Sequence, residues 1–228
     1  MTQEKEIKII LLKLSLDEFV ERIINKGFKK EKDIYQLDIY FDTKDWYLYE
    51  NLAALRLRIV NGKDYSFSFK KMFYRPQNRD HYFIEEIETK FPFDDTSKFK
   101  EIFGILDINY DERKFVSGQE IIDYLKYYNY FDEQKMPEVR QIYVYGEDEI
   151  TIDNVDKVGI IIELECKENE PLEIIKTILN DSEWERSLEG TSYIWLKNVK
   201  GLTSHIKNLE RFKTDPTWNV WKTDNFSS

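Results

Sequence analysis

With 228 residues, of which 41% are hydrophobic, the chain is long enough for one large domain, or for one domain with an appendage. Its net charge of −10 at pH 7 argues against a general nucleic-acid or anionic-membrane binder, because phosphate-rich surfaces attract basic proteins. A single cysteine, Cys166, excludes an internal disulfide framework and a Cys-rich zinc site. We find no signal peptide and no apolar stretch near the roughly 20 residues that span a bilayer, so we expect a cytoplasmic protein.

The first half of the chain is predicted to consist mainly of strands. Charged and apolar residues alternate from Glu4 to Leu14, as on a strand with two different faces. Ser15, with Glu18 three residues later, matches a capping box, and the helix that it begins should end at Gly27. Further strands are expected at Lys32–Asp42, Leu55–Val60, Tyr65–Lys71 and Tyr82–Phe91, with a hairpin at Asn61-Gly62. This order favours an antiparallel sheet or barrel over alternating parallel strands and helices.

The second half mixes helices and strands. Residues 94–136 are predicted to form a helical, aromatic-rich insertion. Strands are expected at Val139–Tyr145, Glu149–Asp153 and Gly159–Lys167, and helices at Pro171–Leu179 and Ser192–Lys197. We therefore predict an α+β domain over residues 1–200, with a C-terminal extension over residues 201–228.

Charged residues recur at every second position of these strands, with apolar residues between them. The apolar residues should form one covered face, so the charged ones must point towards water. If the sheet closes on itself, the charged side chains line its lumen. Placing charges there costs free energy unless they are neutralised by one another, by cations or by an anionic ligand. The acidic set is Glu4, Glu6, Glu86, Glu88, Asp153, Glu163 and Glu165, and the basic set is Lys8, Arg56, Arg58, Lys70 and Arg140.

The chemistry of the two sets indicates a phosphate ligand together with a divalent metal. Carboxylate oxygens suit Mg²⁺ or Mn²⁺. Lysine and arginine bind phosphate oxygens, and arginine can do so through two parallel hydrogen bonds. A metal bridged to phosphate and flanked by basic groups is the usual equipment of phosphoryl transfer. Any one charged pair is better explained as a solvated strand face, so it is the complete set that favours a site.

The order of the motifs resembles that of the CYTH superfamily of triphosphate tunnel metalloenzymes. The Glu-x-Glu-x-Lys signature at the N-terminus of that family is matched by Glu4, Glu6 and Lys8. Blocks similar to those of the family follow in the same order: QLDIYFDT, ALRLR, SFSFKK, EEIE, RQIY, EITIDNV, GIIIELE and GTSYIWL. The first signature alone would be weak, whereas ordered blocks over residues 4–197 are a strong resemblance.

The resemblance implies a closed eight-stranded antiparallel β-barrel with flanking helices, a divalent cation, and a small-molecule triphosphate or nucleotide as substrate. Matched by motif, the residues that would hold the phosphates are Lys8, Arg56, Arg58, Lys70 and Arg140. Those that would bind or orient the metal are Glu4, Glu6, Glu86, Glu88, Asp153, Glu163 and Glu165, with Glu4, Glu6 and Lys8 at the catalytic centre.

Three functions are compatible with such a site. The leading hypothesis is hydrolysis of inorganic triphosphate, thiamine triphosphate or a nucleoside triphosphate, dependent on Mg²⁺ or Mn²⁺. The alternatives are a class IV-type adenylyl cyclase, which makes cyclic AMP and pyrophosphate from ATP, and a non-catalytic module that binds a nucleotide or triphosphate. Glu138 stands where many family members carry a basic residue, so we expect a thinner phosphate clamp on that strand. We expect no nucleic-acid or membrane partner, and a homodimer stays open.

Overall fold

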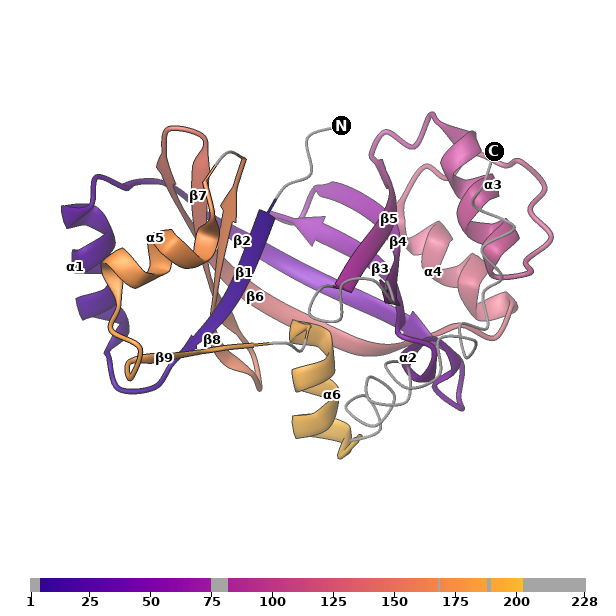
Figure 1. The fold of residues 1–228 in the computed structure, drawn as a ribbon. Coiled ribbons are helices and arrows are strands. Elements are labelled where there is room, and N and C mark those ends of the chain that lie inside the picture. Colours follow the sequence, from indigo (N-terminus) through magenta and orange to yellow (C-terminus); the bar gives the residue numbers. More distant parts are fainter. Residues whose placement is uncertain (1–4, 75–81, 168, 188–189, 203–228) are drawn as a thin grey trace. The chain divides into compact units, whose positions relative to one another are not determined.

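The computed structural model describes residues 5–74, 82–167, 169–187 and 190–202 (Figure 1). Glu4 and nearly all of the predicted extension lie outside these ranges. The elements in chain order are β1 (Lys5–Leu11), α1 (Leu16–Asn25), β2 (Lys29–Asp42), α2 (Tyr47–Glu50), β3 (Ala53–Val60), β4 (Asp64–Tyr74), β5 (Tyr82–Lys90), α3 (Thr96–Ile105), α4 (Gly118–Tyr127), β6 (Phe131–Tyr145), β7 (Asp148–Val155), β8 (Gly159–Cys166), α5 (Pro171–Ile178), β9 (Trp184–Arg186) and α6 (Thr191–Lys200). No helix in the described ranges has the length and apolar character needed to cross a membrane.

The strands form one sheet in the order β5-β4-β3-β2-β6-β7-β8-β1-β9. The neighbouring pairs whose register is defined are antiparallel, which confirms the predicted α+β class with an antiparallel sheet. The predicted closed barrel of eight strands is wrong, because the described residues give nine strands in an open order. β1 pairs with β8 on one side and with β9 on the other. A closed barrel would need this second edge of β1 to pair with the strand at the far end of the sheet.

The chain divides into two compact units. Unit 1 comprises the described residues of Met1–Gln36 and Met136–Val199, and unit 2 those of Leu37–Lys135 and Lys200–Ser228. β2 and β6 each contribute residues to both units.

In unit 1, α1 and α5 cover the apolar face of β1, β7 and β8 (Figure 1). Phe19 and Ile23 of α1 and Ile175 of α5 are completely buried in this core. The predicted capping box is confirmed, since the Ser15 hydroxyl accepts a hydrogen bond from the Glu18 amide while the Glu18 carboxylate accepts one from the Ser15 amide. These two bonds fix the start of α1 and therefore its apolar side over the strands.

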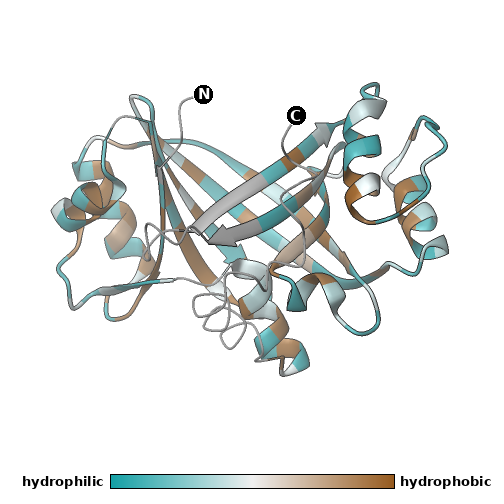
Figure 2. Cartoon of the chain, turned by 45° about the vertical axis from the view of Figure 1, so that its right-hand side comes forward, coloured by the Kyte–Doolittle hydropathy of each residue, from teal (hydrophilic) through white to brown (hydrophobic). Residues whose placement is uncertain are grey.

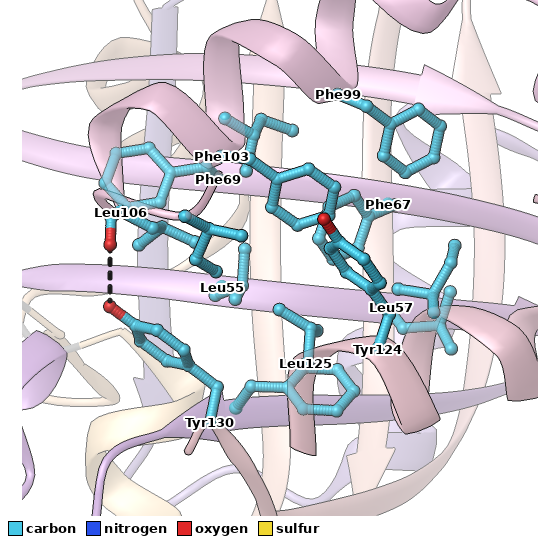
Figure 3. Packing of buried hydrophobic residues seen from close by; sticks show 14 of the residues in the cluster. Leu55, Leu57, Phe67, Phe69, Phe99, Phe103, Leu106, Tyr124, Leu125 and Tyr130 are labelled. Atoms are coloured by element: carbon cyan, nitrogen blue, oxygen red, sulfur yellow. Dashed lines mark hydrogen bonds between the residues drawn. The ribbon is translucent and has the colours of Figure 1, made fainter. Parts of the chain in front are cut away.

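Aromatic rings fill the core of unit 2 (Figure 3). Phe67 of β4 stacks on Phe99 of α3 with ring centroids 5.4 Å apart, and Phe99 lies 4.9 Å from the ring of Phe115. Leu55 and Phe69 are buried in the same cluster. Hydrophilic and hydrophobic bands alternate along the strands (Figure 2), so residues one position away from these buried side chains face the other side.

The hairpin between β3 and β4 is confirmed, because Asn61 and Gly62 have positive φ angles of 50° and 73° and Val60 pairs with Asp64. By contrast, β6 begins at Phe131 and not at Val139. Pro137 and the charges in this segment obscure the alternation on which the prediction relied.

Two elements, α2 and β9, were not predicted, because four and three residues are too few to show a period. Asp42 organises α2 by accepting hydrogen bonds from the amides of Thr43, Leu48 and Tyr49, at 2.7, 2.8 and 2.9 Å. Its carboxyl group is buried, and this burial raises its pKa to about 6 in spite of the three donors.

Candidate functional site

The polar face of unit 1 is formed by charged side chains in cross-strand register. Lys8 of β1 lies opposite Glu163 of β8, and Arg140 of β6 lies opposite Asp153 of β7. Residues directly opposite each other in an antiparallel pair share a face of the sheet. These side chains therefore lie on the side of the strands that α1 and α5 leave uncovered.

Ion pairs connect these residues into a short network. The Lys8 Nζ lies 2.7 Å from Glu163 Oε1, and Arg140 Nη2 lies 3.7 Å from Glu163 Oε2. Arg140 also donates two parallel hydrogen bonds of 2.6 Å to the buried carboxylate of Asp153. Glu163 thus bridges the two cations, and Asp153 fixes the plane of the Arg140 guanidinium.

Three carboxylates lie side by side across this face. Glu6, Glu165 and Glu149 occupy paired positions of β1, β8 and β7. Like charges directly opposite each other destabilise a sheet, and a hard divalent cation bound by carboxylate oxygens would relieve the repulsion. The donor set therefore fits Mg²⁺ or Mn²⁺ in chemistry, although no three acidic, histidine or cysteine side chains of the described ranges converge in a metal-binding geometry. Glu149 was missed, but its alternation with Asp153 on β7 could have identified it.

Glu138 is buried on the same strand as Arg140, and its carboxylate accepts a hydrogen bond from the side-chain amide of Gln36. The Gln36 amide thus stabilises the buried carboxylate of Glu138. Glu138 stands at the position where the family resemblance leads us to expect a basic residue. Gln36 belongs to the family-like block of β2, but the sequence did not indicate what it contacts.

The polar face of unit 2 is formed by β3, β4 and β5. Arg56 lies opposite Ser68, which in turn lies opposite Glu88, and Lys70 lies opposite Glu86. Lys70 Nζ is 2.9 Å from Glu86 Oε2, and Arg56 Nη2 is 3.6 Å from the other oxygen of the same carboxylate. Glu86 therefore links the two cations much as Glu163 does in unit 1.

Asp38 of β2 is the most deeply buried carboxylate of this face, with 1% of the residue exposed. Arg58 donates to it through Nε at 2.6 Å and through Nη2 at 2.7 Å, and Arg56 Nη1 lies 3.4 Å from its Oδ2. One buried carboxylate thereby orients two guanidinium groups. Asp38 was also missed, because a single acid in a strand that contains many charges gives no distinct signal.

The structure distributes the predicted site residues over the two polar faces. Unit 1 contains Glu6, Lys8, Arg140, Asp153, Glu163 and Glu165, and unit 2 contains Arg56, Arg58, Lys70, Glu86 and Glu88. Glu4 lies outside the described residues. The assignment of each residue to metal or phosphate stays a prediction.

Lys71 shows how strictly the alternation separates the two faces of β4. It follows Lys70 but is on the core side, 3% exposed, and its Nζ donates a 2.7 Å hydrogen bond to the carbonyl oxygen of Asn51. Burial lowers the pKa of its amino group from 10.5 to about 7. It is therefore a structural lysine and does not belong to the site.

Comparison with known proteins gives one family and several similar folds. The model of the CYTH domain matches residues 2–192 of the chain. No curated protein sequence matches it.

Three solved structures illustrate the fold. The protein PH1819 of Pyrococcus horikoshii OT3 has a TM-score of 0.55 at 21% identity, with 85% of this chain and 97% of that chain covered. A candidate adenylate cyclase of Vibrio parahaemolyticus has a TM-score of 0.53 at 16% identity, with 84% and 96% covered. HpAC1 of Hippeastrum, a candidate adenylyl cyclase reported to have a dominant triphosphatase activity, has a TM-score of 0.53 at 18% identity, with 85% and 95% covered. At these identities the likeness concerns the fold alone.

Proposed function

Because the chain belongs to the CYTH domain family, we propose that it hydrolyses a substrate that carries a triphosphate group, with a divalent metal ion as cofactor. The observation that carries this proposal is that basic side chains and carboxylates occupy the same polar strand faces in paired positions. The side chains of each face neutralise one another in ion pairs, and a metal-bound polyphosphate, which carries both signs of charge, can take over these contacts. The triphosphatase activity reported for HpAC1, a protein of similar fold, gives further support.

We assign the phosphate contacts to Lys8 and Arg140 in unit 1 and to Arg56, Arg58 and Lys70 in unit 2. The guanidinium groups of Arg58 and Arg140 are each held by two hydrogen bonds to a buried aspartate. Groups fixed in this way need little reorganisation when negative charge develops on a phosphoryl oxygen. The aspartates are thus positioning residues for the arginines.

We assign metal binding to the carboxylates of unit 1, with Glu6, Glu165 and Glu149 as the first candidates. A bound divalent cation polarises a phosphoryl oxygen and makes bound water more acidic. Lys8 contacts Glu163 in the present arrangement. When the Lys8 ammonium instead contacts a phosphate oxygen, the Glu163 carboxylate becomes available as a further ligand or as an acceptor for the attacking water. Glu86 and Lys70 would change partners in the same way in unit 2.

A phosphate-release screen tests the proposal. Tripolyphosphate, ATP and thiamine triphosphate are each incubated with the folded protein and Mg²⁺ or Mn²⁺. Lys8→Ala should lower the release by about 100-fold or more, as the loss of one preorganised donor does elsewhere, whereas Lys98→Ala, which removes a surface ion pair with Glu101, should not. Absence of release from all three substrates would contradict the proposed hydrolysis, and activity that survives Lys8→Ala would contradict the assigned site.

Cyclisation of ATP is the second candidate, since two of the proteins with a similar fold are candidate adenylyl cyclases. It would use the same phosphate and metal ligands but would leave cyclic AMP and pyrophosphate. Chromatography of the products from ATP separates the two reactions, because hydrolysis leaves ADP and phosphate, or AMP and pyrophosphate, but no cyclic nucleotide.

A further inference from the structure

Two buried polar atoms of the unit 2 face have no hydrogen-bond partner among the described residues. They are the hydroxyl oxygen of Ser68, a residue with no exposed surface, and the Nε of Arg56, a residue that is 8% exposed. Ser68 lies directly opposite Arg56 in the β3–β4 pair. The Cβ atoms of such a pair are about 5 Å apart and on the same face, so the two unpaired groups are neighbours.

The position of Ser68 is imposed by the residues on either side of it. Phe67 and Phe69 are buried against the aromatic core, where Phe67 stacks on Phe99. Ser68 must therefore face away from the core. A buried hydroxyl without a partner destabilises a folded protein, and an alanine would avoid this cost, so packing alone does not explain a serine here.

Arg56 is held so that Nε stays available. Its Nη1 lies 3.4 Å from Asp38 and its Nη2 lies 3.6 Å from Glu86. Arg58 differs, because its Nε and Nη2 both donate to Asp38. Ser66 stands opposite Arg58 as Ser68 stands opposite Arg56, which makes Ser66 a matched comparison on the same strand and the same face.

We propose that Ser68 is a direct phosphate ligand, whose hydroxyl donates to the same phosphoryl oxygen as Arg56 Nε. The guanidinium nitrogen can only donate, so an atom shared by the two groups must be an acceptor. An anionic oxygen is the strongest such acceptor, and the positive charge of Arg56 excludes a metal ion at that point. This inference rests on the proposed function, since it identifies a further contact of the same substrate.

Ser68→Ala and Ser66→Ala test the inference through two measurements on each protein. The first is the melting temperature without ligand, and the second is the Kd for tripolyphosphate with Mg²⁺, measured by calorimetry. Ser68→Ala should melt no lower than the wild type, because the Ser68 hydroxyl has no hydrogen-bond partner among the described residues. Its Kd should rise by about 10-fold or more, as expected for the loss of a hydrogen bond to a charged group. Ser66→Ala should change the Kd by less than about twofold.

Arg56→Lys, which keeps the charge but lacks Nε, completes a double-mutant cycle. If the two groups share one oxygen, Ser68→Ala should weaken binding less in the Arg56→Lys background than in the wild type, and additive effects would overturn the shared contact. An unchanged Kd in Ser68→Ala, an equal loss in Ser66→Ala, or a clearly lower melting temperature of Ser68→Ala would overturn the assignment of Ser68. Failure of the wild type to bind tripolyphosphate, ATP and thiamine triphosphate alike would instead overturn the proposed function, and this inference with it.

Discussion

Replacing Lys71 by methionine should stabilise the protein at neutral pH and remove a specific part of its pH dependence. The amino group is buried in the folded state, where its pKa is lowered from 10.5 to about 7 by desolvation. Between these two values the unfolded chain binds the proton and the folded protein does not, so the free energy of unfolding rises with pH in this window. Each pH unit well inside this window contributes about 1.4 kcal/mol. Because the folded amino group is itself half protonated near pH 7, the change between pH 7 and pH 9 is about 2 kcal/mol.

Urea unfolding of the wild type and of Lys71→Met at pH 7 and pH 9 measures this contribution. The variant should be the more stable protein at pH 7, and its advantage should shrink by about 2 kcal/mol at pH 9. Asp42, whose pKa is raised to about 6, titrates in both proteins and cancels in the comparison. The Lys71 amino group can donate to the Asn51 carbonyl in both protonation states, so this bond adds no separate titration to the comparison. An equal stability difference at the two pH values would refute this account of Lys71.

Two further predictions concern the polar faces. Asp38→Asn should destabilise the protein by about 3 kcal/mol in urea unfolding, because it removes the buried carboxylate that holds Arg58 and contacts Arg56. Added tripolyphosphate should restore part of the lost free energy of unfolding. A decrease of less than about 1 kcal/mol would show that Asp38 does not hold the arginines. Glu149→Gln should stabilise the metal-free protein by about 0.5 kcal/mol through reduced repulsion from Glu165. The same change should raise the Mn²⁺ concentration needed for half-maximal activity, and an unchanged metal dependence would remove Glu149 from the metal ligands.

Strand alternation predicted the two charged faces because it is a local property of the backbone. Once Leu55 and Leu57 are assigned to the core, Arg56 and Arg58 must lie on the other side, and the structure places them there. The capping box at Ser15 was predictable for the same reason, since all its atoms lie within one turn of the chain.

The sequence could not predict features that depend on pairing between distant segments. Asp38 becomes important only because β2 brings it to the arginines of β3. The hydroxyl groups of Ser68 and Thr151, which have no partner in the part of the chain that the structure describes, can be recognised only when their neighbours are known. The strand β9, which ends the sheet beside β1, was not predictable because its three residues carry no periodic signal.

The short strand β9 also has a consequence for aggregation. A strand at the end of a sheet exposes unpaired backbone groups, and these can template the addition of another chain. β9 occupies the outer edge of β1 with three residues only, and two of them, Glu185 and Arg186, are exposed charged residues. A longer apolar strand at this position would offer a continuous ladder of amides and carbonyls to a neighbouring molecule. We therefore interpret β9 as a blunt, charged end that protects the sheet from edge-to-edge association.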